Sequence, residues 1–147
     1  MKKNKTPKLE LTAQERQRLR AHKSRLNEIH KLSLEDLSFI LKVTSERARE
    51  IKALSEFQSV PSIGPQFAKD LMKLGYYELN ELKNRDGAAL FEDLERLIKV
   101  RIDPCVEDQF RLIVFVANHP GSDKQWWDFT EERKTYRAAN GYANRPD

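Results

Sequence analysis

Apolar residues recur at intervals of three and four along most of the chain, which is the periodicity of amphipathic helices. The stripes that this spacing predicts to face a core lie in segments 34–41, 48–54, 67–74, 90–98 and 106–117. No segment alternates apolar and polar residues in the way that a half-buried strand does. The sequence therefore predicts an all-α protein.

Residues that start and stop helices flank these stripes. Thr12 and Glu15 have the spacing of a capping box, and a helix is expected to run from there to about residue 29. Its apolar positions are sparse, so this helix has only a narrow stripe to bury. Further candidate starts are Ser33, Thr44, Pro65, Gly87, Asp103 and Thr130, and candidate stops are Gly75 and Gly121.

Charge is distributed unevenly along the chain. Residues 1–31 contain ten Lys or Arg and three Glu, whereas the remaining 116 residues contain 17 basic and 20 acidic side chains. Residues 1–11 are Lys-rich and show no periodicity, so they are expected to be disordered. The basic arm, which a polyanion would meet first, consists of Arg16, Arg18, Arg20, Lys23 and Arg25. The alternative is that this arm is only a solvated tail.

Several classes of protein are disfavoured by the sequence. No apolar run approaches the roughly 18 residues that a membrane span needs, and the basic start is not followed by the apolar stretch of a secretory signal. Cys105 is the single cysteine, so neither an internal disulfide nor a multi-cysteine metal site is expected. These features predict a cytoplasmic protein that does not contact a membrane.

Catalytic chemistry is also disfavoured. The chain has no Gly-rich phosphate loop, no His/Asp/Glu cluster with metal-ligand spacing, and no His near Cys105 in sequence. Cys105 is therefore interpreted as a buried structural residue, and neither an enzyme nor an organic cofactor is expected. Trp126 and Trp127 are interpreted as a lid over the helical core, with Phe129 and Tyr136 beside it, and the alternative is stacking on exposed bases.

The segment Val60-Pro61-Ser62-Ile63-Gly64, between two predicted helices, resembles the helix-hairpin-helix motif of DNA repair and replication proteins. Ala68 occupies the position at which that family packs its two helices together. The sequence departs from the family pattern at Ser62, where Gly is usual, at Pro65, which lacks an N–H, and at Gln66. A second hairpin without glycines is expected around Leu41-Lys42-Val43, which would make a tandem, SAM-like helical domain.

The resemblance implies a site for the sugar-phosphate backbone of DNA. Outward-facing amides at a helix N-terminus bind anions, and small residues let a phosphodiester approach them closely. By resemblance, the phosphate-binding residues are Ser62, Gly64, Gln66 and Lys69. The resemblance also implies a monovalent cation held by the backbone carbonyls of Gln58, Val60 and Ile63.

Across about residues 34–137 the chain is similar to the small bacterial proteins of the pathogenicity-locus Cdd1 family. The motifs that carry this resemblance include Leu74-Gly75-Tyr76, Ile102-Asp103-Pro104-Cys105, Gln109-Phe110-Arg111 and Trp126-Trp127-Asp128-Phe129-Thr130. The expected organisation is a basic tail and helix over residues 1–31, a helix-hairpin-helix domain over 32–121, and an aromatic segment with a C-terminal helix packing on it over 122–147.

Two functions are consistent with these observations. The first is an accessory protein that binds double-stranded DNA without sequence specificity, through the hairpin and the basic arm. The second is a protein–protein adaptor in which the hairpin is only a structural corner. The hairpin and the charge asymmetry favour the first, whereas Ser62, Pro65 and the acidic balance beyond residue 31 favour the second.

Overall fold

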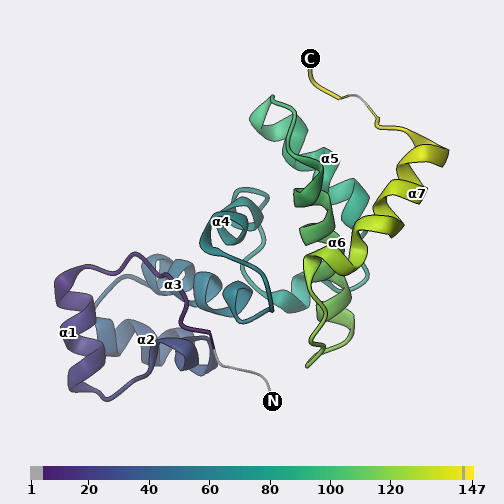
Figure 1. Cartoon of the computed structure of the whole chain (residues 1–147). Helices are drawn as coiled ribbons and strands as arrows, with labels where there is room; N and C mark the ends of the chain where they lie inside the picture. Colours follow the sequence, from purple (N-terminus) through teal and green to yellow (C-terminus); the bar gives the residue numbers. More distant parts are fainter. Residues whose placement is uncertain (1–4, 144) are drawn as a thin grey trace.

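The structure is a computed structural model that describes residues 5–143 and 145–147. Within these residues the protein is all-helical and contains no strand, as the periodicity predicts. In Figure 1 α1 and α2 lie at one end of the molecule, α5, α6 and α7 lie at the other, and α3 and α4 lie between them. The α-helices and the 3-10 helices (η) run in the order α1 (Ala13–Ala21), η1 (Leu26–Lys31), α2 (Leu34–Leu41), α3 (Ser45–Gln58), α4 (Pro65–Lys73), η2 (Leu79–Leu82), α5 (Gly87–Ile98), α6 (Pro104–Asn118), η3 (Trp126–Phe129) and α7 (Thr130–Asn140).

The first helix begins where the sequence predicts and ends earlier. Its capping box is present, because Glu15 N–H donates to Thr12 Oγ1 over 3.1 Å and Thr12 N–H donates to Glu15 Oε1 over 2.9 Å. The predicted extent to residue 29 is wrong: α1 ends at Ala21, and a 3-10 helix follows from Leu26 to Lys31. The break between them lets Leu19 and Ile29, which are 2% and 0% exposed, both reach the core.

The predicted disorder of residues 1–11 is wrong for residues 5–11, and residues 1–4 lie outside the described part of the chain. Leu9 and Leu11 are buried in the core. The Lys8 N–H donates to Gln58 Oε1 over 3.0 Å, and Gln58 Nε2 donates to Lys8 O over 2.9 Å. Residues 5–11 are extended and therefore show no helical periodicity. Their Lys-rich composition does not indicate that two leucines and two hydrogen bonds hold them against the helices.

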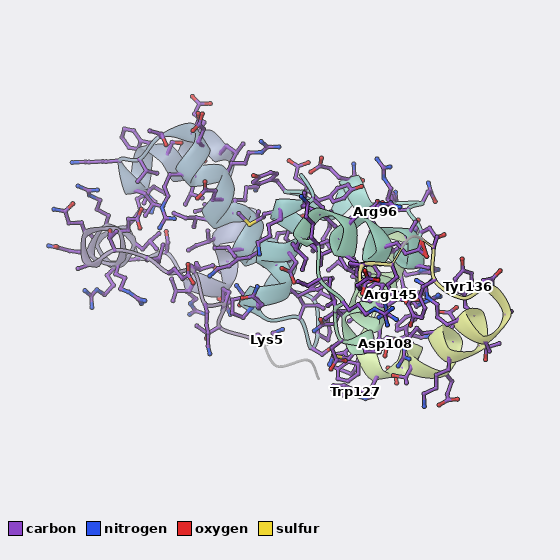
Figure 2. The ribbon with its side chains drawn as sticks, turned by 90° about the horizontal axis from the view of Figure 1, so that it is seen from above. Lys5, Arg96, Asp108, Trp127, Tyr136 and Arg145 are labelled. Atoms are coloured by element: carbon purple, nitrogen blue, oxygen red, sulfur yellow. The ribbon has the colours of Figure 1, made fainter. Side chains whose placement is uncertain are left out.

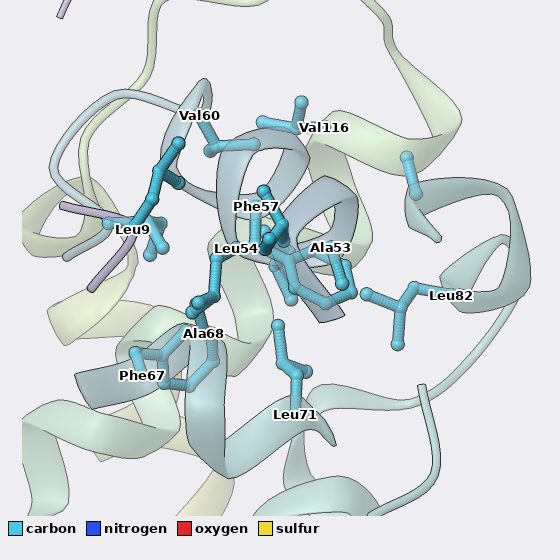
Figure 3. Close-up of a cluster of buried hydrophobic side chains, with 14 of the residues drawn as sticks. Leu9, Ala53, Leu54, Phe57, Val60, Phe67, Ala68, Leu71, Leu82 and Val116 are labelled. Atoms are coloured by element: carbon cyan, nitrogen blue, oxygen red, sulfur yellow. The ribbon is translucent and has the colours of Figure 1, made fainter. Parts of the chain in front are cut away.

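Helices α3 and α4 pack against each other around small and apolar side chains. Ala68 and Leu71 are fully buried, and the Phe67 ring meets Phe110 of α6 edge-on at 4.8 Å between centroids. Figure 3 shows this cluster with Leu9 of the N-terminal segment among its members. Helix α4 is followed by Gly75 in the left-handed region at φ +92°, which is the predicted stop.

Helices α5 and α6 approach each other closely at a glycine. A Cβ on Gly87, the first residue of α5, would lie 2.9 Å from the backbone N and Cα of Arg111 in α6. Helix α6 starts as predicted, because Asp103 Oδ1 accepts from the Cys105 N–H over 2.9 Å and Pro104 is the first helical residue. The absence of a side chain at Gly87 therefore sets the separation of these two helices.

The C-terminal segment differs from the sequence prediction in two details. Thr130 does not cap α7: it is the first helical residue, and its hydroxyl donates to Asp108 Oδ2 over 2.9 Å. The predicted tryptophan lid is only half correct. Trp126 is half-buried and Phe129 is buried, whereas Trp127 is 55% exposed and Tyr136 is 37% exposed. The apolar cover of the core is supplied by Trp126 and Phe129.

Candidate nucleic-acid interface

The turn between α3 and α4 is anchored from inside by two apolar side chains. Val60 and Ile63 are 2% and 1% exposed. The Val60 N–H donates to Phe57 O over 3.2 Å, and the Ile63 N–H donates to Val60 O over 3.2 Å. These contacts hold the backbone of residues 59–64 in place, while Ser62 and Gly64 remain partly exposed.

Ser62 adopts a backbone conformation that favours glycine. Its φ is +63°, in the left-handed region, where a Cβ is unfavourable. The side chain compensates through a contact with η3, because Ser62 Oγ accepts from the Trp126 N–H over 3.0 Å. The turn therefore keeps its geometry with serine and is tied to the aromatic segment by the same side chain.

The first turn of α4 presents unused backbone donors. The N–H groups of Ser62, Gly64 and Gln66 have no acceptor among the residues that the structure describes, and Pro65 has no N–H. Gly64 is the N-cap residue and provides no side-chain cap of its own. Because the positive end of the helix dipole adds to these free donors, the arrangement is suited to bind an anion.

No steric contact within the fold requires Gly64 to be small. Its φ is −101°, which any residue adopts, and a Cβ built on it meets no atom within 4 Å. Gly87 is the opposite case, since a Cβ there would collide with the backbone of α6. The space in front of Gly64 is therefore open to an atom from outside the chain.

The two side chains predicted to contact phosphate lie on α4 beside the turn but are engaged within the protein. Lys69 forms an ion pair with Glu10 of the N-terminal segment. Gln66 Nε2 donates to Asp70 Oδ1 over 3.4 Å, and burial raises the pKa of Asp70. A phosphate arriving at the turn would have to compete with Glu10 for Lys69.

The part of the basic arm that lies on α1 and the turn are at opposite ends of α3. Arg47, near the start of α3, forms an ion pair with Glu15 of α1 at 3.0 Å, whereas the turn follows the end of α3 (Figure 1). With 14 residues, α3 is about 21 Å long at about 1.5 Å per residue. A duplex would therefore have to span roughly six base pairs to reach both.

Most of the arm is free to interact. Arg18 is the exception, because its Nη1 donates to Leu41 O over 2.7 Å. The other four cations are exposed and form no ion pair with any residue in the described part of the chain: Arg16, Arg20, Lys23 and Arg25.

The carbonyls expected to hold a monovalent cation have another occupant. Lys5 Nζ donates to Val60 O over 2.9 Å and to Ile63 O over 2.8 Å. Lys5 makes no hydrogen bond to the carbonyl of Gln58, the third expected ligand, whose side chain holds the Lys8 backbone. A free cation does not fit at the Val60 and Ile63 oxygens together with this ammonium. Among residues 5–143 and 145–147, no group of three or more His, Cys, Asp or Glu is placed to hold a metal ion.

Cys105 is only partly buried, so the prediction of a buried cysteine is wrong, but its side chain is still unsuited to act as a nucleophile. Burial and the neighbouring Asp103 carboxylate raise the pKa of its thiol to about 11. The thiolate is the reactive form, so the side chain is almost entirely in its unreactive form at neutral pH.

A buried network of charges in the C-terminal half is not apparent from the sequence. Glu107 and Asp108 of α6 are fully buried. Asp108 Oδ1 accepts from Arg133 Nε over 2.8 Å, and Glu107 Oε1 accepts from Arg137 Nε over 2.8 Å. The only sequence signals are two adjacent acids inside the amphipathic helix α6 and two arginines four residues apart on the polar helix α7. Because both carboxylates are matched by arginines, the network joins α6 to α7 and leaves no free acid or base.

Comparison with known proteins places this architecture in a family. The model of the family described as Cdd1, pathogenicity locus, matches residues 50–135, which is more than half of the chain. The chain belongs to the Cdd1 pathogenicity-locus family. The match includes the turn, α4, α5 and α6, but not α1 and α2.

A curated relative matches a similar length of this Cdd1 protein. It is 28% identical over 88 residues to the mitomycin resistance protein McrB of Streptomyces lavendulae, a match that covers 60% of this chain and 83% of the relative. No solved structure matches. In the part of the chain that the structure describes, no helix is long and apolar enough to cross a bilayer.

Proposed function

We propose that this Cdd1-family protein is a non-enzymatic accessory protein that binds the backbone of double-stranded DNA without sequence specificity. In this proposal, α3, the turn and α4 act as a helix-hairpin-helix, and α2 with α3 forms the second, glycine-free hairpin of a tandem, SAM-like domain. The observation that carries the proposal is the open space at Gly64 beside the free N–H groups of Ser62, Gly64 and Gln66. Together they form a small, positively polarised surface that a phosphate oxygen fits.

The exposed cations of α1 supply the long-range part of the interaction. Arg16, Arg20, Lys23 and Arg25 are unpaired within the described chain and therefore available to phosphates. Binding of this kind releases counterions, so affinity falls steeply as salt rises. It carries no base information, because only backbone groups of the DNA are contacted.

Fluorescence anisotropy of a labelled duplex at two salt concentrations tests the proposal. The full-length protein is compared with Gly64→Ala, Gly64→Glu and a variant in which Arg16, Arg20, Lys23 and Arg25 are all Gln. The arm is neutralised by substitution because deleting residues 1–31 would also remove Leu9, Leu19 and Ile29 from the core. We expect salt-sensitive binding that weakens in every variant, most in Gly64→Glu, with unchanged circular dichroism. If the Gly64 variants bind DNA as tightly as the wild type, the turn has only a structural role.

One surface favours the adaptor as a second candidate function. Phe39 of α2 is 81% exposed and borders a hollow of ≈ 550 Å³ whose lining includes Arg18, His22 and Ile40. An exposed aromatic ring beside such a hollow is typical of protein-interaction sites. A folded protein with no affinity for DNA at low salt would favour the adaptor, and Phe39→Ser should then abolish capture of its partner.

The name of the curated relative suggests a cellular readout. Survival of a bacterial host in the presence of mitomycin, with and without this protein, would show whether the resistance for which McrB is named extends to it. The Gly64→Glu variant is the matched control, because a protective effect that depends on the turn should be lost.

A further inference from the structure

The side chain of Lys5 reaches the turn between α3 and α4 from the N-terminal segment. Although 55 residues separate them in sequence, Lys5 Nζ donates to Val60 O over 2.9 Å. It also donates to Ile63 O over 2.8 Å. Both carbonyls belong to the turn that carries the proposed phosphate site, and Figure 2 labels Lys5 at the junction between the two halves of the molecule.

This contact is not an incidental surface ion pair. Glu28 and Asp123 line the same ≈ 380 Å³ hollow as Lys5, yet no carboxylate in the described part of the chain lies within ion-pair distance of its ammonium. Lys5 is exposed as a whole, but partial burial lowers its pKa from the usual value of 10.5, so holding the charge there has some desolvation cost. Convergent acceptors offset that cost, and the two turn carbonyls provide them.

The chain around Lys5 holds it in position. Lys8 exchanges two backbone-to-side-chain hydrogen bonds with Gln58, the last residue of α3, at 3.0 and 2.9 Å. Leu9 is 3% exposed in the core beneath them. A tethered ammonium has a high effective concentration at the carbonyls, so it competes favourably with ions from solution.

We propose that Lys5 is the built-in cation of the turn and takes the place of a dissolved monovalent ion. Its ammonium neutralises the negative ends of the Val60 and Ile63 carbonyls, which would otherwise repel a nearby phosphate. The consequence for DNA rests on the proposed function, whereas the occupancy of the carbonyls does not. The protein therefore keeps its turn intact in solutions that lack small monovalent cations.

The first test measures thermal stability at matched ionic strength in the chlorides of potassium, sodium and choline. We expect the same melting temperature for the wild type in all three salts. Lys5→Gln should melt lower in choline chloride, by about 3 °C for a stability loss near 1 kcal/mol, and should recover saturably as potassium or sodium is added. Lys8→Gln is the matched control: it removes the same charge three residues away, from an exposed side chain without a partner in the described chain, and should behave as the wild type.

Lys5→Gln with equal stability in all three salts would overturn the proposal. A second measurement uses the wild type alone: nitrogen-detected NMR should show a distinct, slowly exchanging ammonium signal that is absent from Lys5→Gln and present in Lys8→Gln. Absence of that signal from the wild type would also overturn it.

Duplex binding in choline chloride then tests the consequence for DNA. Lys5→Gln should bind about tenfold more weakly than the wild type and recover when potassium is added, whereas Lys8→Gln should not respond to potassium. If the wild type does not bind DNA in any salt, the proposed function is wrong, and the melting experiment still decides the role of Lys5.

Discussion

Ser62 combines an unfavourable backbone conformation with a compensating contact. Its φ of +63° lies where a side chain is strained, and its hydroxyl oxygen accepts the Trp126 N–H over 3.0 Å. A serine therefore replaces the glycine expected of such a turn, and it links the turn to η3, 64 residues away in sequence.

Substitutions at Ser62 should separate these two effects. Ser62→Ala keeps the strain and loses the hydrogen bond, so it should reduce the free energy of unfolding by about 1 kcal/mol. Ser62→Gly loses the bond but relieves a strain of similar size, so its stability should stay close to the wild type. Urea denaturation of the three proteins measures both changes. Equal stability of Ser62→Ala and the wild type would mean that the Trp126 contact does not stabilise the fold.

The reactivity of Cys105 offers a second test at the residue scale. Its pKa is raised to about 11 by burial and by Asp103, so the folded protein should react with a disulfide reagent at pH 8 much more slowly than a thiol with the ordinary pKa of 9.0. Asp103→Asn keeps a capping side chain and removes the charge, and it should react faster than the wild type. A folded wild type as reactive as the urea-unfolded chain would contradict this assignment.

At the scale of elements, two glycines at helix starts have opposite requirements. Gly87→Ala places a methyl group within 2.9 Å of the Arg111 backbone, so α5 and α6 must separate. Overpacking of this kind should lower the free energy of unfolding by about 2 kcal/mol. Gly64→Ala meets no atom within 4 Å and only puts a poorer residue at the N-cap, so it should cost less than about 1 kcal/mol while weakening DNA binding. Chemical denaturation of both variants measures this difference, and a stability loss in Gly64→Ala as large as that in Gly87→Ala would contradict it.

The contact between α6 and α7 depends on charges that are sealed from water. Asp108 is fully buried and accepts from Arg133 and Thr130, so Asp108→Asn leaves Arg133 with a much weaker partner. Removing one member of such a pair should cost about 3 kcal/mol. Asp93→Asn is the matched control, because its pair with Arg96 is about half exposed on both sides and should contribute less than about 1 kcal/mol. Equal effects of the two substitutions in guanidinium denaturation would contradict a buried network.

For the whole molecule, the N-terminal segment limits access to the proposed DNA site. Glu10 pairs with Lys69, so one of the cations beside the turn is partly neutralised from within the chain. The same segment brings Lys5 to the turn and carries the chain on to the basic helix α1. The proposed site is therefore assembled from residues far apart in sequence.

Glu10→Gln should increase affinity for duplex DNA by about threefold, because it frees Lys69 and removes one negative charge near the turn. Anisotropy titrations at low salt measure the change. Glu131→Gln is the control: it changes the net charge equally, on an 88% exposed side chain of α7, and should have a smaller effect. In a Lys69→Gln background the gain from Glu10→Gln should disappear, and its persistence there would show that Glu10 does not act through Lys69.

Most of the helices could be predicted because their signals are local. The capping box at Thr12 and Glu15, the start of α6 at Asp103 and Pro104, and the stop at Gly75 all depend on groups within one turn of each other. The break after Ala21 could not be predicted, because it serves the burial of Leu19 and Ile29 against distant helices. The docking of residues 5–11 has the same cause.

The sequence by itself determined the all-helical class, the position of the turn and the residue types at its tip, because periodicity, capping and turn chemistry act over a few residues. Only the tertiary structure decided that Lys5 lies on the Val60 and Ile63 carbonyls, that Lys69 faces Glu10, and that Asp108 meets Arg133. These contacts join residues 25 to 59 positions apart. The packing of whole helices determines which of these residues meet, and no short stretch of sequence contains that information.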